Sequence, residues 1–235
     1  MKSTERFSAT VDEYVRHRPS YPDVLLRWLV RTAPGQRVVD LGCGTGIFAR
    51  QLVGAGFEVT GVEPNREMRE AAVGVVCVAG TAEATGLPDG SADVVTGAQA
   101  FHWFDLDRAL QEIARVLVSG GLAVAVWNDR VGTGFAAAYD EVLTAHSEAY
   151  RVVPRPGPTI EALAERLPQG EEIAFEHAQE LDLAGVIGRA WSSSYVVHGV
   201  GDKASFDADL ERAFRAHEVG GRVSLGYRTR AFHWR

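Results

Sequence analysis

The feature that most constrains the fold is a glycine-rich turn that follows an apolar run. Residues 38–46 read VVDLGCGTG, with glycines at positions 42, 44 and 46. Glycine lets the backbone turn tightly, and it lets a ligand approach where a Cβ atom would stand in the way. A predicted helix, Ile47–Val53, and a predicted strand, Glu58–Glu63, follow the turn. A strand, a glycine loop, a helix and a second strand that ends in an acid predict an adenosine-containing ligand, with Glu63 accepting the ribose hydroxyls.

The same alternation of short apolar runs and helical stretches continues to residue 128. Continuous apolar runs of this kind suit strands that are buried on both faces of a parallel sheet. The pattern predicts an α/β, Rossmann-like, doubly wound and mostly parallel sheet with right-handed crossovers. The further predicted elements are the strands Arg37–Leu41, Val75–Ala79, Ala92–Gly97 and Leu122–Trp127 and the helices Asn65–Val73 and Asp105–Val118.

The two ends of the chain differ from this core. Residues 14–30 predict helical pieces that Pro19 and Pro22 interrupt. Beyond the core, Gly134–Tyr150 predicts a helix that runs into a proline-rich bend. Two alternating stretches predict strands that form an antiparallel edge and complete a seven-stranded sheet: Glu172–Leu183 and Arg222–Trp234.

We expect a single domain over residues 1–235. Its expected parts are an N-terminal helical lid (1–33), a ligand-binding core (36–128), and substrate-side helices with the C-terminal strands (129–235).

Composition argues against several classes of function. The formal charge of −7 disfavours nucleic acid as a partner, because phosphate binding needs a dense basic face. The two cysteines, Cys43 and Cys77, and the seven scattered histidines match no metal-ligand spacing, so we expect no metal. There is no signal-like segment and no apolar run near membrane-spanning length, so a cytoplasmic protein without a membrane partner is expected.

The spacing of the glycines narrows the choice of nucleoside. In a dinucleotide-binding loop, Gly-x-Gly-x-x-Gly, the third glycine would fall at Ile47. The observed Asp40-x-Gly42-x-Gly44-x-Gly46 instead resembles the loop of class I S-adenosylmethionine (SAM)-dependent methyltransferases. The resemblance implies SAM as the cofactor and S-adenosylhomocysteine as its product.

Two further motifs resemble a subfamily of small-molecule methyltransferases of type 11, similar to trans-aconitate methyltransferases. They are YxxxRPxYP, which begins at Tyr14, and AQAFHWF at residues 98–104. The resemblance implies a cofactor site made of Arg18, Asp40, Gly42, Gly44, Gly46, Glu63, Pro64, Thr81, Ala82, Glu83, Ala98 and Gln99. Many relatives carry aspartate at position 81 to hold the adenine amino group, so here either Glu83 or the Thr81 hydroxyl would serve.

The crowded rings of residues 101–104 follow the fourth predicted strand, whose carboxyl end points at the ligand. Aromatic faces attract a sulfonium cation, and rings exclude water from the reacting atoms. His102 is the only histidine expected near the methyl group, so it is the candidate catalytic residue, either as a general base or by orienting the acceptor through a hydrogen bond. A second interpretation is that the run only caps the next helix, with Asp105 as the N-cap.

The acceptor side is expected to use residues from both ends of the chain. The expected set is Tyr14, Tyr21, His102, Trp103, Trp127, Asn128, Trp191 and Tyr195. Several have alternatives: Trp127 as core packing, Arg18 as a solvated surface residue, and Trp191 with Tyr195 as packing of the lid on the sheet.

The expected activity is methyl transfer to oxygen or nitrogen of a small-molecule acceptor by direct in-line displacement, in a monomer or homodimer. Two alternatives stay open: a regulatory module that binds SAM without transferring its methyl group, and an NAD(P)-dependent oxidoreductase.

Overall fold

The structure is a computed structural model that describes residues 17–152 and 159–235. Seven strands form one mixed sheet in the order β3-β2-β1-β4-β5-β7-β6. The strands are β1 (Arg37–Leu41), β2 (Glu58–Val62), β3 (Val76–Val78), β4 (Ala92–Ala98), β5 (Leu117–Arg130), β6 (Glu171–Leu181) and β7 (Val223–Trp234). The first five are parallel, and β7 pairs antiparallel with both β5 and β6. The predicted fold class, including the antiparallel C-terminal edge, is confirmed.

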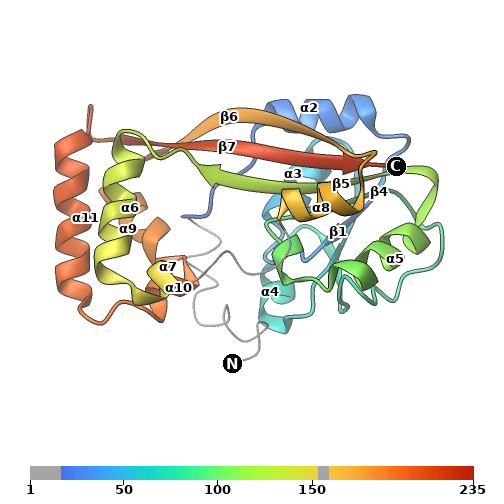
Figure 1. Cartoon of the computed structure of the whole chain (residues 1–235), viewed down its shortest axis with the longest axis horizontal. Helices are drawn as coiled ribbons and strands as arrows, with labels where there is room; N and C mark the ends of the chain where they lie inside the picture. The colour runs from blue at the N-terminus through green and yellow to red at the C-terminus, as the bar shows by residue number, and fades with distance from the viewer. Residues whose placement is uncertain (1–16, 153–158) are drawn as a thin grey trace.

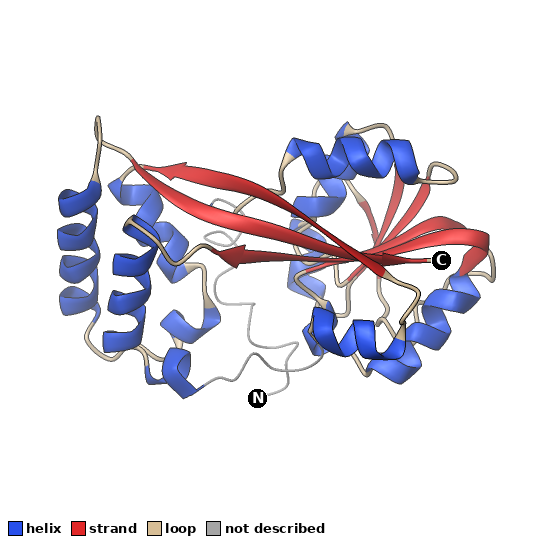
Figure 2. Cartoon of the chain, turned by 45° about the horizontal axis from the view of Figure 1, so that its top comes forward, coloured by secondary structure: helices blue, strands red, loops and turns tan. Residues whose placement is uncertain are grey.

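Helices cover both faces of the parallel part of the sheet (Figure 2). Those described are α2 (Asp23–Thr32), α3 (Ile47–Gly54), α4 (Arg66–Ala71), α5 (Leu106–Val116), α6 (Phe135–His146), α7 (Glu148–Val152), α8 (Ile160–Arg166), α9 (Leu183–Trp191), α10 (Ser194–Val197) and α11 (Lys203–His217), with a 3-10 turn, η3 (Phe101–Trp103). Leucines of α2 and α3 pack against one face, and α5 and α8 pack against the other. The strands between them are therefore buried on both sides, which explains their continuous apolar runs.

Side-chain caps determine where several helices begin. Asn65 accepts a hydrogen bond from the Met68 amide at 2.9 Å, and Asp182 accepts one from the Gly185 amide at 2.7 Å. Asp105 begins α5 in the same way, as its place after the aromatic run predicted.

The antiparallel strands carry a second apolar cluster away from the parallel core. β5, β6 and β7 extend beyond the other strands of the sheet toward a group of helices that includes α6, α9 and α11 (Figure 1). Residues of these helices pack on the far ends of β6 and β7, with Phe206, Leu210 and Tyr227 among the fully buried side chains. We call α6, α9, α10, α11 and these strand ends the helical lobe.

Several elements differ from the sequence predictions. β5 is longer than predicted at both ends, because Leu117 pairs with Ala92 of β4 and pairing with β7 continues as far as Arg130. The helix predicted over Gly134–Tyr150 is divided at Ser147, whose extended backbone ends α6. α2 packs Leu25 and Leu29 into the core of the sheet, so this part of the expected lid is a core layer. Residues 1–16 lie outside the described residues, and no described helix is both long and apolar enough to cross a membrane.

Candidate functional site

A cavity of about 690 Å³ opens where the parallel strands end. Its walls come from the segments after β1, β2 and β4, from the end of β5, and from the helical lobe. This volume lies within the range of small-molecule and cofactor sites. The carboxyl ends of strands in an open α/β sheet are also the usual place for such sites.

The glycine loop begins directly after β1. Gly42, Gly44 and Gly46 all have positive φ, at 62°, 55° and 78°. A Cβ atom at position 42 would lie 2.8 Å from the Ala100 Cβ, whereas one at position 44 would meet nothing within 4 Å. Glycine at position 42 therefore avoids a clash with Ala100 inside the protein, whereas glycine at position 44 leaves open space in the cavity.

Two buried carboxylates stand beside this loop. Glu63 accepts hydrogen bonds from the Gly44 amide at 3.0 Å and the Asn65 amide at 2.9 Å. Burial raises the pKa of Glu63, while these two bonds and Arg69 act to lower it. The Asp40 carboxylate accepts from the Thr96 hydroxyl at 2.7 Å, and burial raises the pKa of Asp40 to about 7. A cationic or hydroxyl-bearing ligand would stabilise both charges.

The segment after β3 reaches the cavity through Thr81, Ala82 and Glu83. The Glu83 carboxylate accepts a hydrogen bond from the Asp105 amide at 2.8 Å, so Glu83 also holds the start of α5. The Thr81 amide bonds to the Ala84 carbonyl at 3.1 Å in a tight turn.

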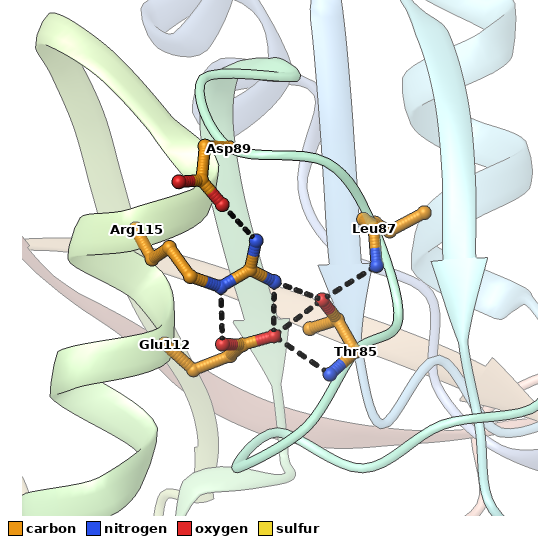
Figure 3. Close-up of polar contacts among 5 residues, drawn as sticks. All are labelled: Thr85, Leu87, Asp89, Glu112 and Arg115. Atoms are coloured by element: carbon orange, nitrogen blue, oxygen red, sulfur yellow. Dashed lines mark hydrogen bonds and ion pairs between the residues drawn. The ribbon is translucent and has the colours of Figure 1, made fainter.

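A polar network anchors this segment to α5 (Figure 3). The Thr85 amide and hydroxyl donate to Glu112 at 2.8 and 2.6 Å, and Arg115 forms an ion pair with Glu112 at 2.7 Å. Arg115 also pairs with Asp89 across the loop. The hydrogen bond from Arg115 holds the pKa of Glu112 at about 2, so the network stays charged over the physiological range.

The turn after β4 contains a strained residue. Gln99 has a φ of 54°, and it is the only non-glycine residue with positive φ among those the structure describes. Its amide bonds to the Val126 carbonyl at 2.8 Å, and its side chain donates to the Asn128 carbonyl at 3.0 Å. Such strain persists only where its surroundings enforce it, and it is common at functional sites.

The four crowded rings divide between the core and the cavity. Phe101 is fully buried and packs against Trp127 with ring centroids 5.9 Å apart. His102, Trp103 and Phe104 line the cavity, and the rings of His102 and Trp103 lie 4.9 Å apart. Asp105 caps α5, so the capping interpretation holds together with the cavity interpretation.

The far end of the cavity is basic and rich in tyrosine. The Arg130 guanidinium pairs with Asp140 at 2.7 Å and donates to the hydroxyls of Tyr150 at 2.7 Å and Tyr195 at 3.4 Å. Burial alone would raise the pKa of Tyr195, but Arg130, Arg189 and Arg18 outweigh it and lower this pKa to about 8.

Arg189 is the most unusual charge at this end. Its side chain lines the cavity and is only 3% exposed. Its guanidinium donates to the hydroxyls of Tyr227 at 3.2 Å, Ser193 at 3.1 Å and Ser192 at 3.4 Å. Within residues 17–152 and 159–235, no carboxylate pairs with it. A buried cation without an anionic partner is costly, unless a ligand supplies the anion.

Most of the predicted site residues that are described line this one cavity. They are Arg18, Tyr21, Asp40, Gly42, Gly44, Glu63, Pro64, Thr81, Ala82, Glu83, Ala98, Gln99, His102, Trp103, Trp127, Asn128 and Tyr195. Arg18 donates to the Ser192 carbonyl at 3.1 Å, beside the helical lobe. Trp127 lines the cavity and is also part of the core.

Three predicted residues stand apart. Gly46 does not line the cavity and serves as the N-cap of α3. Trp191 lies within the helical lobe, where its indole donates to Asp207 at 2.8 Å. Tyr14 lies outside the described residues.

The sequence analysis missed the basic end: Arg130, Asp140, Tyr150, Arg189 and Tyr227. These residues lie on five different elements, β5, α6, α7, α9 and β7, so only the packing of the helical lobe brings them together.

Comparisons with known proteins relate the chain to methyltransferases. Residues 39–125 match the family described as Methyltransferase domain. An uncharacterized methyltransferase of Mycobacterium tuberculosis is 46% identical over 128 residues, which cover 53% of this chain and 52% of that protein. An uncharacterized methyltransferase-like protein of Schizosaccharomyces pombe is 36% identical over 135 residues, 54% of this chain and 53% of that protein. The chain thus spans about half the length of the curated relatives it matches.

A solved structure extends the similarity over nearly the whole chain. A protein of Anaeromyxobacter dehalogenans, described as a candidate type II methyltransferase, has a TM-score of 0.68 and 28% identity, with 93% of this chain and 97% of that chain covered. Residues 39–125 are therefore similar to a methyltransferase domain, and the chain shares its fold with a solved methyltransferase structure over nearly its whole length.

The family implies SAM, and the residues at the acidic end fit it. Thr45 lines the cavity and is buried, and its hydroxyl has no hydrogen-bond partner in the described part of the chain. Gly44 leaves open space, and Asp40 and Glu63 offer carboxylates for an ammonium group and ribose hydroxyls. An acidic cradle with an unsatisfied hydroxyl suits a cationic nucleoside better than a pyrophosphate. Among the described residues there is no group of three or more His, Cys, Asp or Glu that could hold a metal.

Proposed function

We propose that the protein is an enzyme that transfers the methyl group of SAM to oxygen or nitrogen of a small-molecule acceptor by in-line displacement. The observation that carries this proposal is one continuous cavity with two unlike ends. One end has the glycine loop and two buried acids, and the other has two arginines and several tyrosines. A site for two different ligands in contact is what a group transfer requires.

SAM would supply a methyl group on a positively charged sulfur. Glu63 would hold the ribose hydroxyls, while Gly44 and Asp40 would receive the amino acid tail. Gln99, in its strained turn, would fix the wall between the two ligands together with Ala98. The protein's main contribution would be alignment of the reactants and exclusion of water, with no covalent step on a side chain.

Two roles fit His102, which is half-buried at the wall of the cavity. As a general base it would take a proton from a hydroxyl or amine acceptor. As a hydrogen-bond donor it would orient an acceptor that is already ionised. The pH dependence of turnover distinguishes these roles.

The charge of the far end supports an acceptor that carries a negative group. Arg189 is buried with hydroxyl partners, and Arg130 shares one carboxylate, Asp140, with Tyr150. A carboxylate would match the planar guanidinium groups in two parallel hydrogen bonds. The formal charge of −7 on the whole chain makes this local basic end more distinctive.

The first experiment is calorimetric titration of the protein with SAM, S-adenosylhomocysteine and NADH. We expect binding of the first two and none of NADH, and preferential binding of NADH would contradict the proposal.

The second experiment incubates the protein with SAM and a panel of hydroxyl, amine and carboxylate compounds, and it measures the S-adenosylhomocysteine formed. Radiolabel transfer from SAM to a pool of small metabolites extends the search. Tight SAM binding without transfer to any member of either set would favour a regulatory module.

A further inference from the structure

Two thiols meet beside the glycine loop. Cys43 lies between Gly42 and Gly44 and lines the cavity, and Cys77 lies in the edge strand β3. Their sulfur atoms are 3.0 Å apart, although 34 positions separate them in the sequence. Both side chains are half-buried, and neither is in a disulfide. The pair is therefore accessible and already within contact distance.

A glycine in β2 makes room for this contact. Gly61 pairs directly with Cys77 across the parallel ladder. A Cβ atom at position 61 would lie 2.5 Å from the Cys43 sulfur and 3.1 Å from the Cys77 sulfur. Glycine weakens the interior of a strand, and in strands it often marks a close approach of other groups. The missing side chain at Gly61 therefore leaves the space in which the two sulfur atoms meet.

The contact makes the two thiols chemically unequal. The hydrogen bond that the two thiols share lowers the pKa of Cys77, and Arg69 acts in the same direction. The same hydrogen bond raises the pKa of Cys43. The thiolate is the reactive form of cysteine, so Cys77 is the nucleophile and Cys43 the resolving thiol.

We propose that Cys43 and Cys77 form a reversible oxidation site whose disulfide weakens cofactor binding at the adjacent glycine loop. The inference rests on the proposed function, because it assigns a control to that same cofactor site.

The oxidant is a hydroperoxide. The Cys77 thiolate attacks its terminal oxygen, the O–O bond breaks, and Cys77 becomes a sulfenic acid while hydroxide or alkoxide leaves. The Cys43 sulfur then attacks the Cys77 sulfur, the S–O bond breaks and water leaves with the Cys43 proton. The two thiols lose two electrons, and the hydroperoxide is reduced to water, or to water and an alcohol.

Closure of the bond moves the loop. A disulfide requires a sulfur separation of about 2.05 Å, roughly 1 Å shorter than the present contact. Cys43 is flanked by Gly42 and Gly44, so its displacement shifts the Gly44 amide away from Glu63, which now accepts from it at 3.0 Å. Because coupling is reciprocal, a bound cofactor must disfavour the disulfide by the same factor.

The test compares S-adenosylhomocysteine binding by the reduced protein, the peroxide-treated protein and the treated protein after dithiothreitol. Mass spectrometry of alkylated peptides identifies the Cys43–Cys77 link. We expect the link to form, the affinity to fall about tenfold or more, and dithiothreitol to restore it. Prior addition of S-adenosylhomocysteine should slow formation of the link.

Two variants keep the test specific. Cys77→Ser removes the nucleophilic thiol, which does not line the cavity. This variant should therefore bind S-adenosylhomocysteine normally both before and after peroxide treatment. It retains Met68, which lines the cavity and is itself open to oxidation. Gly61→Ala should separate the sulfurs and prevent the link, with folding checked by circular dichroism.

Three results would overturn the inference. They are the absence of the Cys43–Cys77 link after peroxide, a link that leaves the affinity unchanged, and an equal loss of affinity in Cys77→Ser. Failure of the reduced protein to bind S-adenosylhomocysteine would instead contradict the proposed function, since it appears before any oxidation.

Discussion

The two ends of the cavity are built in opposite ways. The acidic end, proposed to bind the cofactor, comes mainly from β1, β2 and the short segments that follow them, and its ionisable groups, Asp40 and Glu63, are carboxylic acids. The basic end, proposed to bind the acceptor, gathers Arg130, Tyr195 and Arg189 from separate elements. The first is held by backbone hydrogen bonds within a local motif, and the second by packing of the helical lobe. Substitutions at the acidic end should therefore change the affinity for the cofactor, whereas substitutions at the basic end should change turnover of the acceptor.

The largest expected effect is at Gly44. Gly44→Val should lower affinity for S-adenosylhomocysteine by more than about 100-fold, because a branched side chain would fill the open cradle at a positive φ. Gly220→Val is the matched control, since Gly220 has a φ of 62°, also meets nothing within 4 Å and lies in the turn before β7. The control should lose stability but keep affinity in calorimetric titration. Equal affinity in both variants would mean that Gly44 serves only the turn.

Glu63→Ala should have the next largest effect. Loss of hydrogen bonds to a charged group predicts weaker S-adenosylhomocysteine binding by about 1.5–3 kcal/mol. The Gly44 amide also loses its acceptor, so the loop should loosen. Glu70→Ala, on the exposed face of α4, is the control. Parental affinity in Glu63→Ala would remove this carboxylate from the site.

Arg189→Gln tests the other end. For acceptors with a negative group, kcat/KM should fall about 10–100-fold, the range for a lost hydrogen bond to a charged group. S-adenosylhomocysteine affinity should not change, and Arg189→Lys should recover part of the loss. Arg212→Gln, at an exposed arginine of α11, serves as the control. If neutral and charged acceptors lose rate equally, Arg189 does not recognise charge.

His102→Ala and Trp103→Ala test the boundary between the ends. Turnover should fall about tenfold, with a smaller change in S-adenosylhomocysteine affinity, because these rings align the acceptor. If His102 is a base, the parent's rate should fall on the acid side and His102→Ala should abolish that limb. If it only orients, His102→Asn should keep substantial activity and the acid limb should remain. Unchanged turnover in both alanine variants would assign the rings to packing.

The smallest effect concerns Asp40 and pH. Its pKa of about 7 lies above the ordinary 3.8, because burial favours the neutral form and the Glu63 charge adds to this. Its contribution to stability is therefore complete below pH 3.8 and is lost as pH rises through about 7. Cofactor affinity should change in the opposite direction, rising by up to about tenfold between pH 6 and 8 as the carboxylate ionises.

Asp40→Asn should flatten both pH dependences. Denaturant melts and titrations at several pH values measure the two trends, and a variant with the parent's pH slopes would assign them to another group.

The geometry of the acidic end, proposed to bind the cofactor, was predictable because its signals are local. The β-branched runs that form β1 and β2, the glycines that need positive φ, and the acid at position 63 are all visible within about thirty residues, and strand pairing brings them together. Parallel pairing follows from the alternation of strands and helices, so the fold class followed as well.

The acceptor end depended on tertiary structure. The extension of β5 to Arg130 follows from pairing with β7, a partner about a hundred residues away. The same pairing allows the helical lobe to bury Arg189 against Tyr227, whereas Trp191, on the same helix, turns away to Asp207. The contact of Cys43 with Cys77 likewise depends on the missing side chain at Gly61 in the strand between them. Local periodicity determined which segments became strands and helices. Only packing decided which side chains from distant segments share the cavity, because that choice depends on how whole elements stack.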